Sequence, residues 1–213
     1  MVEKIFENRT DKNKDFKFHM HKFIATFGFV GRIKYMPGTF GSLVAFPVWF
    51  LLVIMSMNIN ESLVLDFKKV YFSVQIFAIL AFFVTGVISG GYYAKQIGAE
   101  DPKDVVMDEV VGQLITINLC MIGNVSIFSA LDNNQMLDTT TIILFFFVLP
   151  FALFRLFDIF KPWPIGWMDK NIKGGLGIML DDVLAAIFAV VSYYIIILLL
   201  IDFYWGKIIV ANY

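Results

Sequence analysis

After a charged N-terminal segment, three polar segments interrupt a largely apolar sequence, and each carries residue types that take part in catalysis. Residues 37–42 are rich in glycine and hydroxyl side chains, and residues 104–112 contain the adjacent acids Asp108 and Glu109. Residues 155–182 combine both charges, in Arg155, Asp158, Lys161, Asp169, Asp181 and Asp182. Carboxylate oxygens without Cys or His favour a hard cation, and Mg²⁺ is the one we expect. Mg²⁺ beside fixed cations suits phosphoryl chemistry, which needs charge neutralisation and an aligned nucleophile.

The candidate metal ligands are five carboxylates: Asp108, Glu109, Asp158, Asp181 and Asp182. Because Mg²⁺ takes only one or two protein carboxylates, some of these must act as general base or support the ligands. The expected catalytic residues are Asp108, Glu109, Asp158, Asp182, Arg155 and Lys161. The free N–H groups at the start of a helix can also bind phosphate. The expected substrate-binding residues are Gly38, Thr39, Gly41, Ser42, Lys161, Gly174 and Gly175.

Each polar segment also has a simpler structural interpretation, which the sequence leaves open. Asp181 and Asp182 at the start of a helix suit an N-cap and a favourable partner for the helix dipole. Arg155 and Asp158 have the spacing of a helical ion pair, and residues 37–42 can be a turn and a cap. The adjacent acids of the second segment are harder to explain in this way. Apolar residues enclose them, and ionised carboxylates are costly at a membrane boundary.

The amino-acid composition indicates the class of protein in which these segments lie. Of 213 residues, 59% are hydrophobic and only 16% are charged, which leaves too few charges for the surface of a soluble fold. The mean hydropathy of +0.75 agrees, so we expect a membrane protein. A net charge of −1 excludes a global basic field that would recruit nucleic acid. The single cysteine, Cys120, excludes an intramolecular disulfide and a zinc site built from several cysteines.

Five charge-poor stretches are candidate membrane spans, and they predict an all-α, polytopic membrane helical bundle of four to five spans. Four of them are residues 40–57, 70–94, 139–154 and 183–201. The first and third of these are short for the roughly 20 residues that a span needs, so flanking residues should extend them. The fifth stretch, residues 110–131, carries several polar side chains and is the weakest prediction.

The distribution of Lys and Arg predicts the orientation of the bundle. Fourteen of the 17 basic residues fall in residues 1–39, 95–109 and 155–182, which five spans put on one side of the membrane. By the positive-inside rule that side is the cytoplasm, so cytoplasmic loops should form the site. Residues 1–20 are a charged N-terminal extension without the apolar core of a signal peptide. Residues 16–27 interleave aromatic and basic residues, which suits a helix that lies on the membrane surface.

Several phosphatase classes are excluded by motifs that the sequence lacks. Ser126 stands where a Cys-x5-Arg phosphatase built on Cys120 would need its Arg. The Asp-x-Asp-x-Thr motif of aspartyl-phosphate enzymes and the Asp-Gly-x2-Ala-Arg run of CDP-alcohol phosphotransferases are both absent. His19 and His21 lie in the charged N-terminal segment, where we expect them on the surface. A carboxylate–metal hydrolase or a non-catalytic membrane protein remains, and the hydrolase would use direct attack by water rather than a covalent phospho-enzyme.

Three segments closely resemble signature segments of the phosphatidylglycerophosphatase A family. They are MPGTFGSLVAFP (36–47), VVMDEVVG (105–112) and FRLFDIFKPWPIGWMDKNIKGGLGIMLDDVLAA (154–186), in the order of the family. The resemblance implies a membrane domain over residues 21–205 that removes the terminal phosphate of phosphatidylglycerophosphate with Mg²⁺. The product would be phosphatidylglycerol in the bacterial inner (cytoplasmic) membrane. Lys173 departs from the family, in which His is frequent at that position.

Two other functions stay open. The chain can be a metal-dependent phosphatase of another lipid phosphate, because the sequence does not show which phosphate is reached. Less favoured is a transporter whose intramembrane carboxylates bind cations. Transporters are marked by broken helices and midplane charges, whereas these acids lie at the ends of spans. The expected partner is the phospholipid substrate, no nucleic acid is expected, and the sequence gives no oligomeric state.

Overall fold

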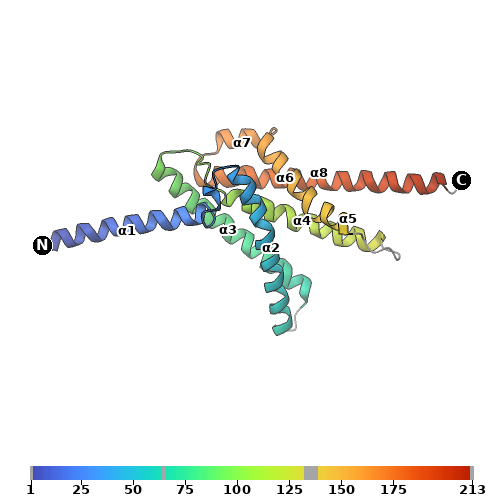
Figure 1. Cartoon of the computed structure of the whole chain (residues 1–213), viewed down its shortest axis with the longest axis horizontal. Helices are drawn as coiled ribbons and strands as arrows, with labels where there is room; N and C mark the ends of the chain where they lie inside the picture. The colour runs from blue at the N-terminus through green and yellow to red at the C-terminus, as the bar shows by residue number, and fades with distance from the viewer. Residues whose placement is uncertain (1, 64–65, 132–138, 212–213) are drawn as a thin grey trace.

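The computed structural model describes residues 2–63, 66–131 and 139–211, and all regular structure in these ranges is helical (Figure 1). Side-chain surroundings are described for residues 13–63, 66–123 and 139–202. In chain order the elements are α1 (Val2–Ala25), η1 (Val30–Arg32), α2 (Pro37–Leu63), α3 (Phe67–Ile97), α4 (Met107–Leu131), α5 (Thr139–Ile143), η2 (Leu144–Val148), α6 (Leu149–Phe160), α7 (Ile165–Asn171) and α8 (Gly174–Ala211). The predicted all-α fold is therefore confirmed.

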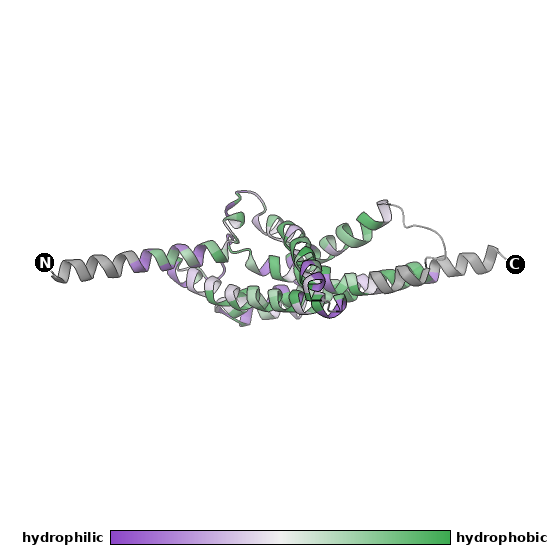
Figure 2. Ribbon diagram, turned by 90° about the horizontal axis from the view of Figure 1, so that it is seen from below, coloured by the Kyte–Doolittle hydropathy of each residue, from purple (hydrophilic) through white to green (hydrophobic). Residues whose placement is uncertain are grey.

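Four helical segments of the described chain are long and apolar enough to cross a membrane. They are Pro37–Leu63, Phe67–Ile97, Thr139–Phe160 and Gly174–Asp202. Each contains one predicted span, and flanking turns lengthen the two short ones, as the thickness of a bilayer requires. Figure 2 shows hydrophobic residues along much of these helices. The chain is a helical membrane protein.

The weakest predicted span, residues 110–131, lies in α4, which packs against α2, α3, α6 and α8. Val110 and Leu114 of α4 are completely buried. One of the polar side chains that weakened the prediction, Asn118, makes hydrogen bonds to α3. The amide oxygen of Asn118 accepts a hydrogen bond from the Tyr71 hydroxyl at 2.7 Å. A helix enclosed by other helices can carry such interhelical hydrogen bonds, and the crossing of the membrane by α4 stays a prediction.

Glycines let the start of α8 approach α3 and α4 closely. A side chain at Gly112 of α4 would collide with the ring of Phe154 and press on the backbone carbonyl of Asp182. A side chain at Gly175 of α8 would collide with the backbone carbonyl of Val87 on α3. The first turns of α8 are therefore held directly against both neighbouring helices.

The charged N-terminal segment is helical, as predicted for residues 16–27, and α1 ends at Ala25. Ala25 is completely buried where α1 packs against α3, and the helix extends away from the bundle toward the N-terminus (Figure 1). His19 is exposed as expected, but His21 is half-buried. Its Nδ1 lies 3.1 Å from the hydroxyl oxygen of Ser89. The surface prediction for His21 is wrong because α1 turns that side of the helix toward α3.

Candidate active site

The first part of the site joins the adjacent acids of α4 to one acid of α8. Asp108 and Glu109 stand in the first turn of α4. Their carboxylate oxygens and one from Asp182 of α8 lie within 4.8 Å of one another. The close contact of α4 with α8 at Gly112 contributes to this spacing, because Gly112 faces the backbone of Asp182. We call these three acids the carboxylate cluster.

The carboxylate cluster is short of hydrogen-bond donors. Asp182 is only 2% exposed. Three buried oxygens have no hydrogen-bond partner among the described residues: Asp108 Oδ1, Glu109 Oε2 and Asp182 Oδ2. Burial, followed by the charge of Glu109, raises the pKa of Asp108 well above its ordinary value, and burial raises the pKa of Glu109 to about 8. A hard divalent cation neutralises and ligates such oxygens, so the donor set fits Mg²⁺ in charge and atom type.

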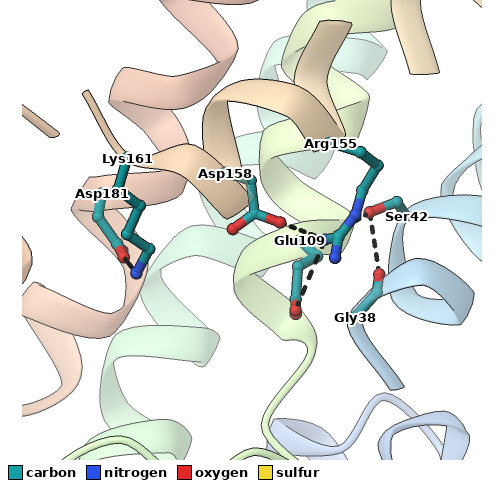
Figure 3. Close-up of polar contacts among 7 residues, drawn as sticks. All are labelled: Gly38, Ser42, Glu109, Arg155, Asp158, Lys161 and Asp181. Carbon is teal, nitrogen blue, oxygen red and sulfur yellow. Dashed lines mark hydrogen bonds and ion pairs between the residues drawn. The ribbon is translucent and has the colours of Figure 1, made fainter. Parts of the chain in front are cut away.

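Arg155 of α6 lies beside the carboxylate cluster and connects three helices (Figure 3). Its Nη1 makes a short ion pair with Asp158, lies 3.9 Å from Glu109 Oε1, and donates to the Ser42 hydroxyl at 3.4 Å. Ser42 in turn donates to the carbonyl oxygen of Gly38 at 3.0 Å. The helical ion pair with Asp158 is therefore real, but it is one part of a larger network. Through this network a guanidinium group is held next to the carboxylate cluster.

Lys161 forms a second basic centre at the end of α6. Its backbone is left-handed, with φ 40° and ψ 57°, a region that non-glycine residues seldom occupy. The Nζ atom donates to Asp169 Oδ1 at 2.8 Å and to Asp181 Oδ2 at 2.5 Å. Burial lowers the pKa of Lys161, but these two hydrogen bonds and the charges of both acids raise it overall. Lys161 is thus a fixed, fully charged ammonium group.

The five candidate metal ligands therefore divide into two sets. Asp108, Glu109 and Asp182 form the carboxylate cluster, whereas Asp158 pairs with Arg155 and Asp181 pairs with Lys161. Figure 3 shows Asp158 between the two basic centres. Asp158 is still connected to the cluster through Arg155, whose Nη1 also lies 3.9 Å from Glu109 Oε1, and Asp181 directly precedes Asp182.

The glycine-rich segment of α2 packs on the start of α4. A side chain at Gly38 would collide with the carboxylate of Glu109, and one at Gly41 would press on Val106. Gly38, Gly41 and Ser42 are buried, and Thr39 is half-buried. These residues thus let α2 approach the carboxylate cluster closely. Phosphate binding by their amide groups stays a prediction.

A small polar cavity of about 140 Å³ adjoins Lys161 at the start of α8. It is lined by Glu100, Asp101, Asp169, Lys173, Gly174 and Asp181, with three neighbouring apolar or glycine residues. Gly174 takes a left-handed φ of +76°, which glycine adopts without strain. Asp169 had no predicted role, because no spacing rule relates it to Lys161 across the turn at residues 162–164. Gly175 lies against α3, and its contact with substrate stays a prediction.

These features define a class of protein. It is a helical membrane protein in which a carboxylate cluster suited to a divalent cation lies beside an Arg and a Lys suited to phosphate. The family described as Phosphatidylglycerophosphatase A has a sequence model that matches residues 23–197. The chain belongs to the phosphatidylglycerophosphatase A family, and it is accordingly an enzyme, a phosphoric monoester hydrolase. The resemblance seen in the signature segments is confirmed.

Two of the following three relatives carry the name of this family. The chain is 30% identical to Phosphatidylglycerophosphatase A of Escherichia coli strain K12 over 156 aligned residues. The aligned region is 71% of this chain and 69% of the relative. It is 30% identical over 159 aligned residues to a Bacteroides thetaiotaomicron protein named "Putative phosphatidylinositol-3-phosphatase". The aligned region is 75% of this chain and 82% of that relative. Phosphatidylglycerophosphatase A of Haemophilus influenzae is 63% identical over 41 residues, 19% of this chain and 25% of the relative. No solved structure matches the chain.

Proposed function

We propose that the chain hydrolyses the terminal phosphomonoester of phosphatidylglycerophosphate to phosphatidylglycerol, and that it requires Mg²⁺. The observation that carries the proposal is the carboxylate cluster, whose buried oxygens lack donors and lie beside Arg155. The family membership supports the same reaction. The phospholipid substrate would reach the site within the membrane, with its head group at the ends of α4, α6 and α8.

The carboxylate cluster of Asp108, Glu109 and Asp182 would hold the cation, with one or two of the three as direct ligands. When bound, Mg²⁺ would neutralise charge on the phosphoryl group and make water more acidic. Arg155 can offer two N–H groups in a planar fork to phosphoryl oxygens. Lys161 keeps one N–H beyond the two that Asp169 and Asp181 accept. A carboxylate that is not engaged with the cation would accept the proton of the attacking water.

We propose direct attack of water on phosphorus, without a covalent phospho-enzyme. Cys120 is buried among Val190, Tyr193 and Ile197, so its thiol lies in apolar surroundings away from the carboxylate cluster. The two histidines belong to α1, and none of the three polar segments contains Cys or His. A phosphorylated enzyme trapped by acid from ³²P-labelled lipid would refute this mechanism and would make a carboxylate the nucleophile.

We also propose that the site faces the cytoplasm at the bacterial inner membrane. The bias of Lys and Arg toward the segments that carry the site supports this orientation. Asp108 in the first turn of α4 supports a site near the membrane surface, and Asp182 lies farther in, in the third turn of α8, which begins at Gly174.

The test of the proposed function is release of phosphate from phosphatidylglycerophosphate in detergent micelles, with Mg²⁺ or with EDTA. We expect turnover only with Mg²⁺. Equal turnover in Mg²⁺ and in EDTA would refute the cation requirement. The absence of turnover in Mg²⁺ would refute phosphatidylglycerophosphate as the substrate. Phosphatidylinositol 3-phosphate is tested in parallel, because the name of the Bacteroides thetaiotaomicron relative favours it as a second candidate. Faster hydrolysis of that lipid would establish the second candidate instead.

A further inference from the structure

The turn and short helix after Lys161 fold back onto it. The Lys161 N–H donates to the Phe157 carbonyl at 2.9 Å and ends α6. A side chain at Gly166 of α7 would approach the Lys161 carbonyl to 2.7 Å, so α7 packs directly on the Lys161 backbone. Asp169, near the end of α7, then reaches Lys161 Nζ at 2.8 Å. Both the backbone and the ammonium group of Lys161 are thus held by α7.

The two acids that hold Lys161 differ in their own surroundings. Asp181 comes from α8, directly before Asp182 of the carboxylate cluster, and its side chain is 7% exposed. The Asp169 side chain is 36% exposed and belongs to a helix of seven residues. Asp181 therefore connects Lys161 to the carboxylate cluster. Asp169 holds the same ammonium group from a second helix, α7. With both contacts the ammonium group has a defined position, and one N–H is left to donate.

We infer that Asp169 is a positioning residue that holds Lys161 where its remaining N–H meets the transferring phosphoryl group. The inference rests on the proposed function, since it assigns Lys161 to the phosphate. Asp169 does not need to touch the lipid for this role. A lysine side chain is flexible, and ordering it before substrate arrives removes an entropic cost from the reaction.

Asp169→Asn should therefore change kcat and leave KM unchanged or lower. The variant loses the carboxylate charge, and the neutral amide oxygen of Asn accepts a weaker hydrogen bond from Lys161. The ammonium group is therefore held less firmly in its position. Misplacing a catalytic group by about 1 Å can cost up to about 10²-fold, and we expect kcat to fall at least tenfold. KM should not rise, because removing a negative charge beside Lys161 does not weaken attraction of an anionic lipid. Asp169→Glu keeps the carboxylate and should restore part of kcat.

Glu100→Gln is the matched control. Glu100 lines the same cavity as Asp169 and pairs with a lysine at the same distance, 2.8 Å to Lys173 Nζ. Its side chain is 77% exposed, and its partner Lys173 is not Lys161. Loss of this ion pair should leave kcat within twofold of the wild type.

A double-mutant cycle with Lys161→Met shows whether Asp169 acts through Lys161. If it does, Asp169→Asn lowers kcat less than twofold once Lys161 is replaced. Full additivity of the two losses, or a normal kcat with only a lower melting temperature, would overturn the inference. The cycle is repeated with Asp169→Ala, so that the result does not depend on the folding of one variant. An inactive wild type would refute the proposed function, whereas an active wild type with a normal Asp169→Asn variant refutes only the role of Asp169.

Discussion

Replacing Asp182 with Asn should stabilise the protein without metal while removing its response to Mg²⁺. Asp182 lies within 4.8 Å of two other carboxylates and is almost completely buried. At that distance and an effective dielectric constant of about 20, two full charges repel by about 3.5 kcal/mol. This value holds at the largest of those separations, and protonation of part of the cluster lowers the repulsion that the folded protein retains. The Asn amide also supplies N–H donors that the cluster lacks.

The same substitution should reduce the stability that Mg²⁺ adds to the protein, relative to the wild type. A ligand that binds the folded state at 100 times its dissociation constant adds about 2.7 kcal/mol of stability. The wild type should gain this stability, and Asp182→Asn should lose most of it because one of three carboxylates is gone. The rate of phosphate release should fall together with the Mg²⁺-dependent gain in stability, because the same carboxylate cluster would serve the reaction. Metal-free stability and metal response thus move in opposite directions in one variant.

The assay is the thermal unfolding midpoint of the detergent-solubilised protein in EDTA and across a Mg²⁺ titration, with phosphate release measured on the same samples. Asp202→Asn is the control, because Asp202 is an exposed acid on the same helix, α8. We expect Asp182→Asn to melt above the wild type in EDTA and to gain little from Mg²⁺. A lower midpoint in EDTA together with a normal gain from Mg²⁺ would show that Asp182 is only a structural acid of α8.

Three further predictions concern the neighbours of the carboxylate cluster. Arg155→Lys should lower kcat by about tenfold or more despite its retained charge, because lysine lacks the planar fork; equal phosphate release by wild type and variant would contradict this. Gly38→Ala should lower activity because its methyl group meets the carboxylate of Glu109, whereas Gly90→Ala should be tolerated because its nearest neighbour is 3.7 Å away. Lys173→Cys in an otherwise cysteine-free chain should be labelled by a membrane-impermeant maleimide only from the cytoplasmic side; labelling of intact cells from outside would reverse the predicted topology.

The fold could be predicted from the sequence to the extent that it depends on long, charge-free runs. Residues 70–94 and 183–201 lie within helices that extend beyond them, because a bilayer requires both the length and the apolar character. Residues 110–131 gave a weaker pattern for a physical reason. Asn118 accepts a hydrogen bond from Tyr71 and donates one to Gln75, both of α3, and such pairing depends on which helices surround α4. A single sequence does not contain that information.

The sequence singles out most of the acids that the structure brings together and gives the spacing of the Arg155–Asp158 pair, but it does not predict how the other acids are distributed. The apolar residues around Asp108 and Glu109 indicate a functional role for these acids. In the structure they lie in a cluster with Asp182. The separation of Asp181 from Asp182 depends on the rotation of α8, which directs one side chain to Lys161 and the other to α4. The role of Asp169 depends on the turn that follows Lys161. Both are properties of tertiary packing, which residue type and spacing do not encode locally.

The order of the helices along the chain has a consequence for biosynthesis. A ribosome completes α2, α4 and α6 before it begins α8, which supplies Asp182. Until α8 packs at Gly112, the acids of α4 lack their third member and Lys161 lacks Asp181. A nascent or truncated chain that stops before residue 174 therefore holds three of the four described segments that are long and apolar enough to cross a membrane, but only part of the candidate site. Under the proposed function, a chain without α8 has no complete carboxylate cluster, and hydrolysis is expected only after the last span is in place.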